Sequence, residues 1–208
     1  MKAKKTEKGF TLIELLLAML IGIVVLISTY NLFTIQSWHF SMQEQKAEML
    51  QNARAGLDLM TREILMAGYN STGSLAPCIG INNATNTPCV GITSATASML
   101  SFSSDLDGDG NLTADSTNPN ENITFDVYTS GGKPALGRTS NGSKQPVVEN
   151  ISALSFTYLD ANNSVTTNLA LVQKLRVSIT AQTAKPNVNQ TYPTIVLSSD
   201  IVPRNLNN

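Results

Sequence analysis

Apolar residues dominate the chain between Phe10 and Phe33, and no other stretch of the sequence shows so strong a pattern. From Leu15 to Ile27 every residue is apolar or glycine. Together with its apolar flanks, this run reaches the roughly 20 residues that an α-helix needs to cross a bilayer. The pattern therefore predicts a membrane-spanning helix over residues 10–35.

In the next segment, residues 36–68, the apolar positions lie on one side only. They recur at alternating spacings of three and four, which places them on one helix face: Leu50, Ala53, Leu57, Met60, Ile64 and Ala67. No proline interrupts residues 10–68, and Gly68 begins a typical stop signal. One helix over residues 10–68 would be roughly 90 Å long, and we expect its one-sided half to pack on the rest of the chain. Gly22 and Gly56 are the expected weak points, each costing up to about 1 kcal/mol relative to alanine.

The remaining segment, residues 69–208, is rich in Asn, Thr, Ser and Gly and has strand-like rather than helical patterns. Bulky residues alternate with small ones, which is typical of strands with one buried face: Leu154, Phe156 and Tyr158, and then Leu175, Val177 and Ile179. Shorter candidate strands cover residues 99–103, 123–128 and 194–198, and prolines punctuate the spaces between several of them: Pro134, Pro146, Pro186 and Pro193. The predicted fold class is α+β, with a long N-terminal helix packed on a C-terminal antiparallel β domain.

A short basic segment precedes the apolar run. It contains Lys2, Lys4, Lys5 and Lys8 against one acid, Glu7, so its side-chain charge is +3, and removing it from a chain of net charge -1 leaves -4. Basic flanks stay in the cytoplasm, so the rest of the chain is predicted to lie outside it. Glu14 stands inside the apolar run, where a charge costs a few kcal/mol and is usually functional.

The segment from Gly9 to Leu17, with its lysines before the glycine and an acid at the fifth position after it, resembles the class III (prepilin-type) signal of type IV pilins. This resemblance implies that prepilin peptidase cleaves between Gly9 and Phe10, removes residues 1–9 as a leader and methylates the new terminus at Phe10. It also implies an assembly role for Glu14, whose carboxylate would pair with the terminal amino group of a neighbouring subunit. The alternative is a simple signal anchor that carries a glutamate by chance.

The resemblance extends along the chain. Residues 51–69 look like the helix end of PilW-type minor pilins and PulJ-type pseudopilins, and residues 148–160, 174–179 and 201–205 are similar to their later strands. Residues 71–146 show no such likeness and form a divergent loop region.

The resemblance implies a PilW-like minor pilin that takes part in initiating or assembling a type IV pilus. Its implied partners are prepilin peptidase, other minor and major pilins, and the inner-membrane assembly platform. The chain would first cross the bacterial inner membrane once, with its C-terminal domain in the periplasm, and would then reach the pilus at the cell surface. A minor pseudopilin of a type II secretion system is one alternative, and a pilus tip adhesin is another.

The chain has two cysteines, Cys78 and Cys89, separated by ten residues. Outside the cytoplasm such a pair can form a disulfide, and we expect it here; closing a short loop typically contributes about 2–4 kcal/mol. Two unpaired thiols are the alternative.

Carboxylates alternate with other residues from position 105 onward, which resembles the first half of an EF-hand calcium loop. The predicted Ca2+ ligands are Asp105, Asp107, Asp109, Asn111 and Asp115. The twelfth position of the loop is Ser116 instead of glutamate, so we expect Asp115 or Glu121 to close the coordination shell. A bound ion would order the loop without taking part in chemistry. The alternative is a solvated Asp- and Gly-rich turn without an ion.

Other functions have little support in the sequence. The chain without its leader is mildly acidic, which argues against nucleic-acid binding. His39 is the chain's single histidine, and neither a nucleophile motif nor an acid–base pair accompanies it. We therefore expect a non-enzymatic protein that requires no cofactor; the Ca2+ ion predicted above would be structural.

Overall fold

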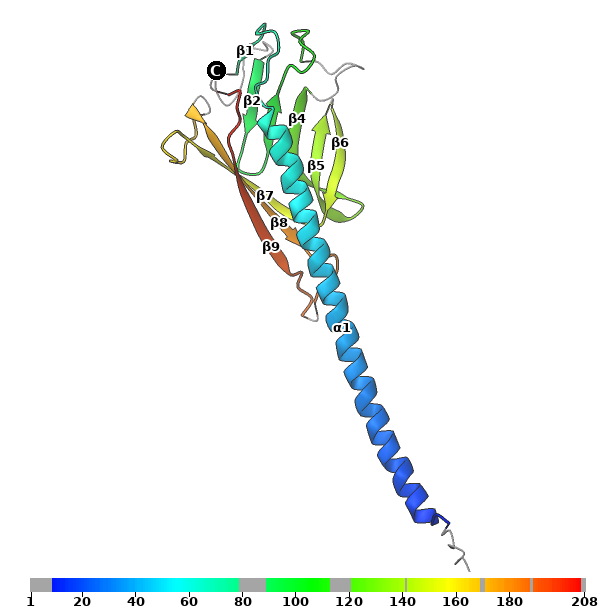
Figure 1. The fold of residues 1–208 in the computed structure, drawn as a ribbon. Helices are drawn as coiled ribbons and strands as arrows, with labels where there is room; N and C mark the ends of the chain where they lie inside the picture. The colour runs from blue at the N-terminus through cyan, green and yellow to red at the C-terminus, as the bar shows by residue number, and fades with distance from the viewer. Residues whose placement is uncertain are drawn as a thin grey trace, which may run out of the picture. The chain divides into compact units, whose positions relative to one another are not determined.

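The computed structural model describes residues 9–78, 89–112, 121–140, 142–168, 171–187 and 189–206. Within these residues one long helix, α1, precedes nine strands, β1 to β9 (Figure 1). The chain divides into two compact units, residues 1–44 and residues 45–208. The first unit holds the apolar part of α1, and the second holds the last part of α1 with all nine strands.

Helix α1 spans Leu12–Leu65 and ends three residues earlier than the sequence predicts. The next residues form tighter turns, because Met66, Ala67 and Tyr69 each donate a backbone bond three residues back. Gly68 has a φ of +80°, and its amide leaves the helix to donate to the Ser103 carbonyl at 3.0 Å. A Cβ at Gly68 would lie 2.8 Å from the Asn205 carbonyl oxygen, so both the backbone conformation and the space require glycine.

The second half of α1 is one-sided, as its sequence predicts. Its buried residues are Met49, Ala53, Gly56, Met60 and Ile64. Leu50 and Leu57, which the periodicity places on the same face, are only partly buried. Gly56 is a point of close packing rather than simply a weak point, because a Cβ there would lie 3.0 Å from Ile179 and 3.2 Å from Leu136. Its missing side chain lets the helix approach both sheets.

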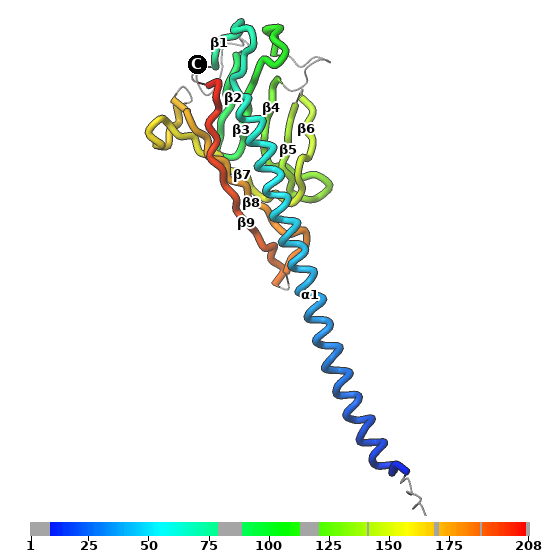
Figure 2. The backbone as a smooth tube through the Cα atoms, in the orientation of Figure 1, coloured from blue at the N-terminus to red at the C-terminus, as the bar shows by residue number. Residues whose placement is uncertain are grey.

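The strands form two sheets, which Figure 2 traces beside the last turns of α1. The six-stranded sheet has the order β1-β2-β3-β4-β5-β6, and its members are β1 (Ala76–Pro77), β2 (Cys89–Ala95), β3 (Leu100–Ser103), β4 (Asn122–Ser130), β5 (Lys133–Ser140) and β6 (Ser143–Glu149). The three-stranded sheet has the order β7-β8-β9, and its members are β7 (Ile151–Leu159), β8 (Lys174–Gln182) and β9 (Thr194–Ile201). All neighbours pair antiparallel except β1 and β2, which are parallel.

Two prolines that the sequence suggests as breaks between strands lie inside strands instead. Pro134 is the second residue of β5, opposite Thr129, and Pro146 lies in β6 opposite Gly137. A sheet tolerates proline near a strand start or at an irregularity, and the β5–β6 register shifts beside Gly137. The turn between β4 and β5 is made by Gly131 and Gly132, both with positive φ, as a tight hairpin requires.

The three-stranded sheet confirms the predicted alternation. Leu154, Phe156 and Tyr158 of β7 are buried. Leu175, Val177 and Ile179 of β8 are fully buried. Ile151 is buried too, because the β7–β8 register shifts between Ile151 and Ala153.

One hydrophobic core joins α1, the six-stranded sheet and the three-stranded sheet within residues 45–208. Met60 and Ile64 of α1 belong to the same buried cluster as Phe102, Phe125 and Ile179 from the two sheets. The rings of Phe102 and Phe125 pack at a centroid distance of 6.2 Å. The observed fold is the predicted α+β class, with the end of a long helix packed on a mainly antiparallel β domain.

Candidate processing and assembly site

The first half of α1 exposes its apolar side chains. None of its most apolar 18-residue window is buried, and the helix is long and apolar enough to cross a membrane. Large residues exposed on this half include Leu16, Leu20, Val24, Ile27 and Phe33. Because exposed apolar patches of this extent mark membrane or protein contacts, this half of α1 is a surface that requires a partner environment.

Three hydroxyl groups in this half are satisfied within the helix. Ser28, Thr29 and Thr34 each donate a bond of 2.8–2.9 Å to the backbone carbonyl four residues earlier. Polar groups in a membrane need such internal partners, because the hydrocarbon core offers no water. The three hydroxyls are therefore compatible with an apolar environment.

Glu14 takes part in the N-terminal cap of α1. Its Oε2 accepts bonds from the Thr11 amide at 2.9 Å and the Thr11 hydroxyl at 3.0 Å, and the Glu14 amide donates to the Thr11 hydroxyl at 3.3 Å. This reciprocal arrangement is a capping box, which satisfies two amides that lack helical partners. The role of Thr11 was not among the predictions from the sequence, although the spacing Thr-x-x-Glu before an apolar run is the signature of this cap.

Gly9 and Phe10 precede the helix in an exposed, non-helical stretch. Phe10 is 90% exposed, and no described atom lies within 4 Å of a Cβ built on Gly9. Residues 1–8 of the predicted leader lie outside the described residues. Cleavage between Gly9 and Phe10 therefore stays a prediction, and this exposed stretch is compatible with it.

The predicted disulfide is present. Cys78 and Cys89 are bonded, with their Cα atoms 4.9 Å apart. Cys78 follows β1 and Cys89 begins β2, and the Cys78 amide also donates to the Val90 carbonyl at 2.8 Å. The bond links the end of the short edge strand β1 to the start of its neighbour β2.

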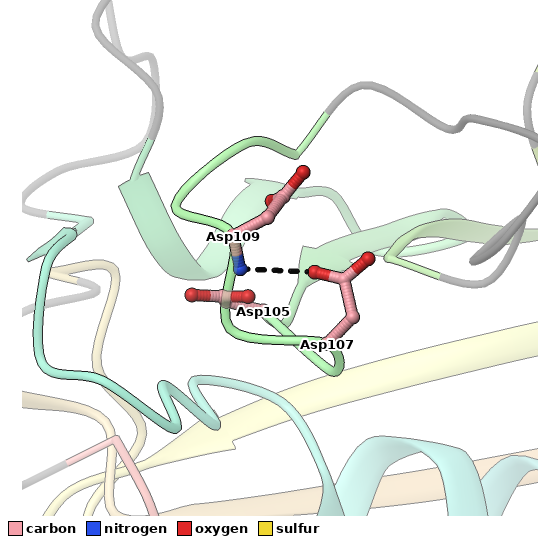
Figure 3. Close-up of side chains that lie close together, drawn as sticks. All are labelled: Asp105, Asp107 and Asp109. Atoms are coloured by element: carbon pink, nitrogen blue, oxygen red, sulfur yellow. Dashed lines mark hydrogen bonds between the residues drawn. The ribbon is translucent and has the colours of Figure 1, made fainter.

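The carboxylates of Asp105, Asp107 and Asp109 gather on one tight loop after β3 (Figure 3). Each uses one oxygen to accept a bond from a backbone amide of the loop: Gly108 to Asp105 at 2.7 Å, Asp109 to Asp107 at 3.0 Å, and Asn111 to Asp109 at 2.7 Å. Asp105 is buried, whereas Asp107, Asp109 and Asn111 are exposed. Asp115, the fifth predicted ligand, lies outside the described residues.

Glu121 reaches the same loop from the residue before β4. Its Oε1 accepts bonds from the amides of Leu106 at 2.9 Å and Asp107 at 3.4 Å. The pKa of Glu121 is raised above its ordinary value, chiefly because the side chain is buried. The two amide bonds oppose this shift, and the nearby carboxylates of Asp107 and Asp105 add to it. The loop therefore gathers four acidic side chains, two of them buried.

Two family models match the chain. Residues 42–197 match the model described as prepilin peptidase-dependent protein B, which covers about three quarters of the chain. Residues 4–30 match the model of the prokaryotic N-terminal methylation motif. Comparisons with curated proteins and with solved structures gave no match.

Proposed function

Because the chain belongs to the prepilin peptidase-dependent protein B family and carries the prokaryotic N-terminal methylation motif, we propose that it is a PilW-like minor pilin. In this proposal prepilin peptidase cuts between Gly9 and Phe10 and methylates Phe10. The chain is then anchored in the inner membrane by α1, with its β domain in the periplasm. From there it helps to start or extend a type IV pilus.

The observation that carries the proposal is the exposed apolar half of α1. Each large apolar side chain removed from water contributes about 1.5–3 kcal/mol, so this half is stable only in a membrane or among other helices. A helix that leaves the membrane to join a filament exchanges the first environment for the second. A long apolar helix and a separately folded unit in the same chain suit both states.

In this proposal Glu14 sets the axial register of the helix during assembly. Both bonds that Glu14 accepts from Thr11 end on Oε2. During assembly the carboxylate would receive the positively charged amino group of a Phe10, most simply from a neighbouring subunit. Opposite charges attract far more strongly in an apolar environment than in water, so this pair would set the axial register of the incoming helix.

Deleting the gene tests the proposal when two outputs are measured in one culture: pilin sheared from the cell surface and enzymes exported to the medium. We expect surface pilin to be lost while export stays normal. Loss of export with normal pili would instead assign the chain to a type II secretion system. Unchanged amounts of both would contradict an assembly role and favour a tip or accessory role.

Complementing the deletion with Glu14→Gln tests the role of the carboxylate. Glutamine keeps the side-chain size, and we expect it to permit cleavage and membrane insertion but to reduce surface pilin at least about tenfold, equivalent to 1.4 kcal/mol. Mass spectrometry of the membrane fraction checks that the chain begins with methylated Phe10. Normal surface pilin with this variant would contradict the register mechanism.

A further inference from the structure

The carboxylate loop after β3 has the spacing that a shared cation requires. One ligand oxygen from each of Asp105, Asp107 and Asp109 lies within 4.8 Å of the other two. Oxygens that bind one Ca2+ ion at about 2.3–2.6 Å are at most about 5 Å apart. The three side chains are therefore close enough to share an ion.

Asp105 supplies a second, independent observation. Its side chain is fully buried, and its Oδ2 atom has no hydrogen-bond partner among the described residues. None of the ion pairs formed within the described residues includes it. Buried carboxylate oxygens in proteins are usually paired with a cation, hydrogen-bonded or bound to a metal. Among the described residues Oδ2 has neither a hydrogen bond nor an ion pair, so a metal ion is the partner that would satisfy it.

A second unsatisfied oxygen lies on Asn70, which forms an isolated β-bridge with Asp105. Its Oδ1 is also buried without a partner among the described residues, while its Nδ2 donates to the Leu75 carbonyl at 2.7 Å. That bond fixes which end of the amide is the oxygen. Both unsatisfied atoms are therefore acceptors, and two acceptors cannot satisfy each other.

We propose that Asp105, Asp107 and Asp109 bind one Ca2+ ion and that Glu121 positions their loop through the amides of Leu106 and Asp107. Carboxylate oxygens are hard ligands that suit Ca2+, and an irregular loop suits its flexible coordination better than the strict octahedron of Mg2+. Asp105 also donates its amide to the Tyr69 carbonyl at 2.8 Å, so the ion would fasten the loop to the segment that follows α1. This site does not depend on the proposed function of the chain.

The test is thermal unfolding of the full chain in detergent, followed by circular dichroism, after removal of metal with a chelator. Binding with a Kd of about 0.1 mM, as in many extracellular modules, would raise Tm by roughly 5–10 °C at 10 mM CaCl2. Equilibrium dialysis with radioactive Ca2+ should give about one ion per chain. No shift up to 10 mM CaCl2, or an equal shift with MgCl2, would overturn the proposal.

The variant D107N/D109N separates ion binding from loop folding, because asparagine keeps an oxygen that can accept the same amide bonds. We expect it to lose the Ca2+-dependent shift while its Tm in chelator equals or exceeds that of the unchanged chain, since two repelling charges are gone. Asp160→Asn is the matched control. Asp160 accepts the amides of Asn162 and Ser164 in a similar turn that lacks the carboxylate cluster. A retained Ca2+ shift in D107N/D109N, or a lost shift in Asp160→Asn, would contradict the assignment.

Discussion

The two halves of α1 differ in how their apolar residues are distributed around the helix. From Leu15 to Ile27 the helix is apolar on all sides, and none of its most apolar window is buried. From residue 45 onward, one stripe is buried against the β strands, and the opposite side carries polar residues such as Arg54 and Asp58. The second half packs on its own chain, whereas the apolar surface of the first half has no partner among the described residues.

Because of this difference, one continuous helix can both stabilise the folded domain and offer an apolar surface for association. A one-sided apolar stripe has its complement in the same sequence, so it contributes to the stability of the folded domain. An all-round apolar surface has no complement in the described part of the chain, so its burial is available to drive association. Identical substitutions in the two halves should therefore have different effects.

The largest expected contrast is between Met60→Ala and Met19→Ala. Met60 is fully buried and Met19 is 62% exposed. Met60→Ala leaves a cavity and should lower the free energy of unfolding by about 2–5 kcal/mol, which corresponds to a fall in Tm of roughly 5–15 °C for a unit of this size. Met19→Ala should change the free energy by less than about 0.5 kcal/mol. Urea unfolding of the full chain in detergent measures both, and equal losses would erase the distinction between the halves.

The two glycines of α1 give the next contrast. Gly56→Leu places a side chain against Ile179 and Leu136, where a Cβ already comes within 3.2 Å, and should destabilise the domain by about 1–3 kcal/mol. Gly22→Leu meets no described atom within 4 Å and replaces a poor helix former, so the helix should gain up to about 1 kcal/mol. Urea unfolding reports the first effect, and helix content by circular dichroism reports the second. A stabilising Gly56→Leu would mean that the glycine is only a weak point, as the sequence alone suggests.

The sequence predicts the features that depend on local periodicity. The three- and four-residue spacing placed Ala53, Met60 and Ile64 on the buried side of α1, and the two-residue alternation placed Leu175 and Val177 inside the sheet. Both follow from the geometry of a single element. The disulfide was also predictable, because only one pairing exists within the chain.

Features that depend on distant parts of the chain were not predictable. Strands β5 and β6 contain Pro134 and Pro146, and their strand character comes from pairing with β4 and with each other. Gly56 acquires its importance only from Ile179 and Leu136, which approach it from two different sheets. In the carboxylate loop the spacing was visible, but the buried state of Asp105 depends on contacts with the segment after α1.

A smaller effect is expected at the start of the helix. Thr11→Val removes the hydroxyl of the capping box and should cost about 1 kcal/mol locally, which corresponds to about fivefold faster exchange of the amides of residues 12–14. Thr34→Val is the matched control, because Thr34 bonds to the Tyr30 carbonyl within the same half but caps nothing. Neither variant should change the unfolding of residues 45–208. Hydrogen exchange with mass spectrometry measures the difference, and equal rates in the two variants would argue against the cap.

The smallest contrast is between two ion pairs of the second half of α1, one partly shielded and one exposed to solvent. Glu63 accepts two 2.9 Å bonds from Nε of Arg138 in β5, and the two side chains are only 21% and 20% exposed. Asp58 pairs with Arg62 on the solvent side, where the exposures are 59% and 74%. Glu63→Gln should cost about 1 kcal/mol, because its partner lies on a strand and is partly shielded, and Asp58→Asn should cost less than about 0.5 kcal/mol. Raising the salt concentration should reduce the second effect further, since exposed pairs are screened. Equal costs in urea unfolding would mean that Arg138 does not hold the helix against β5, and burial of the apolar stripe alone would then account for the packing.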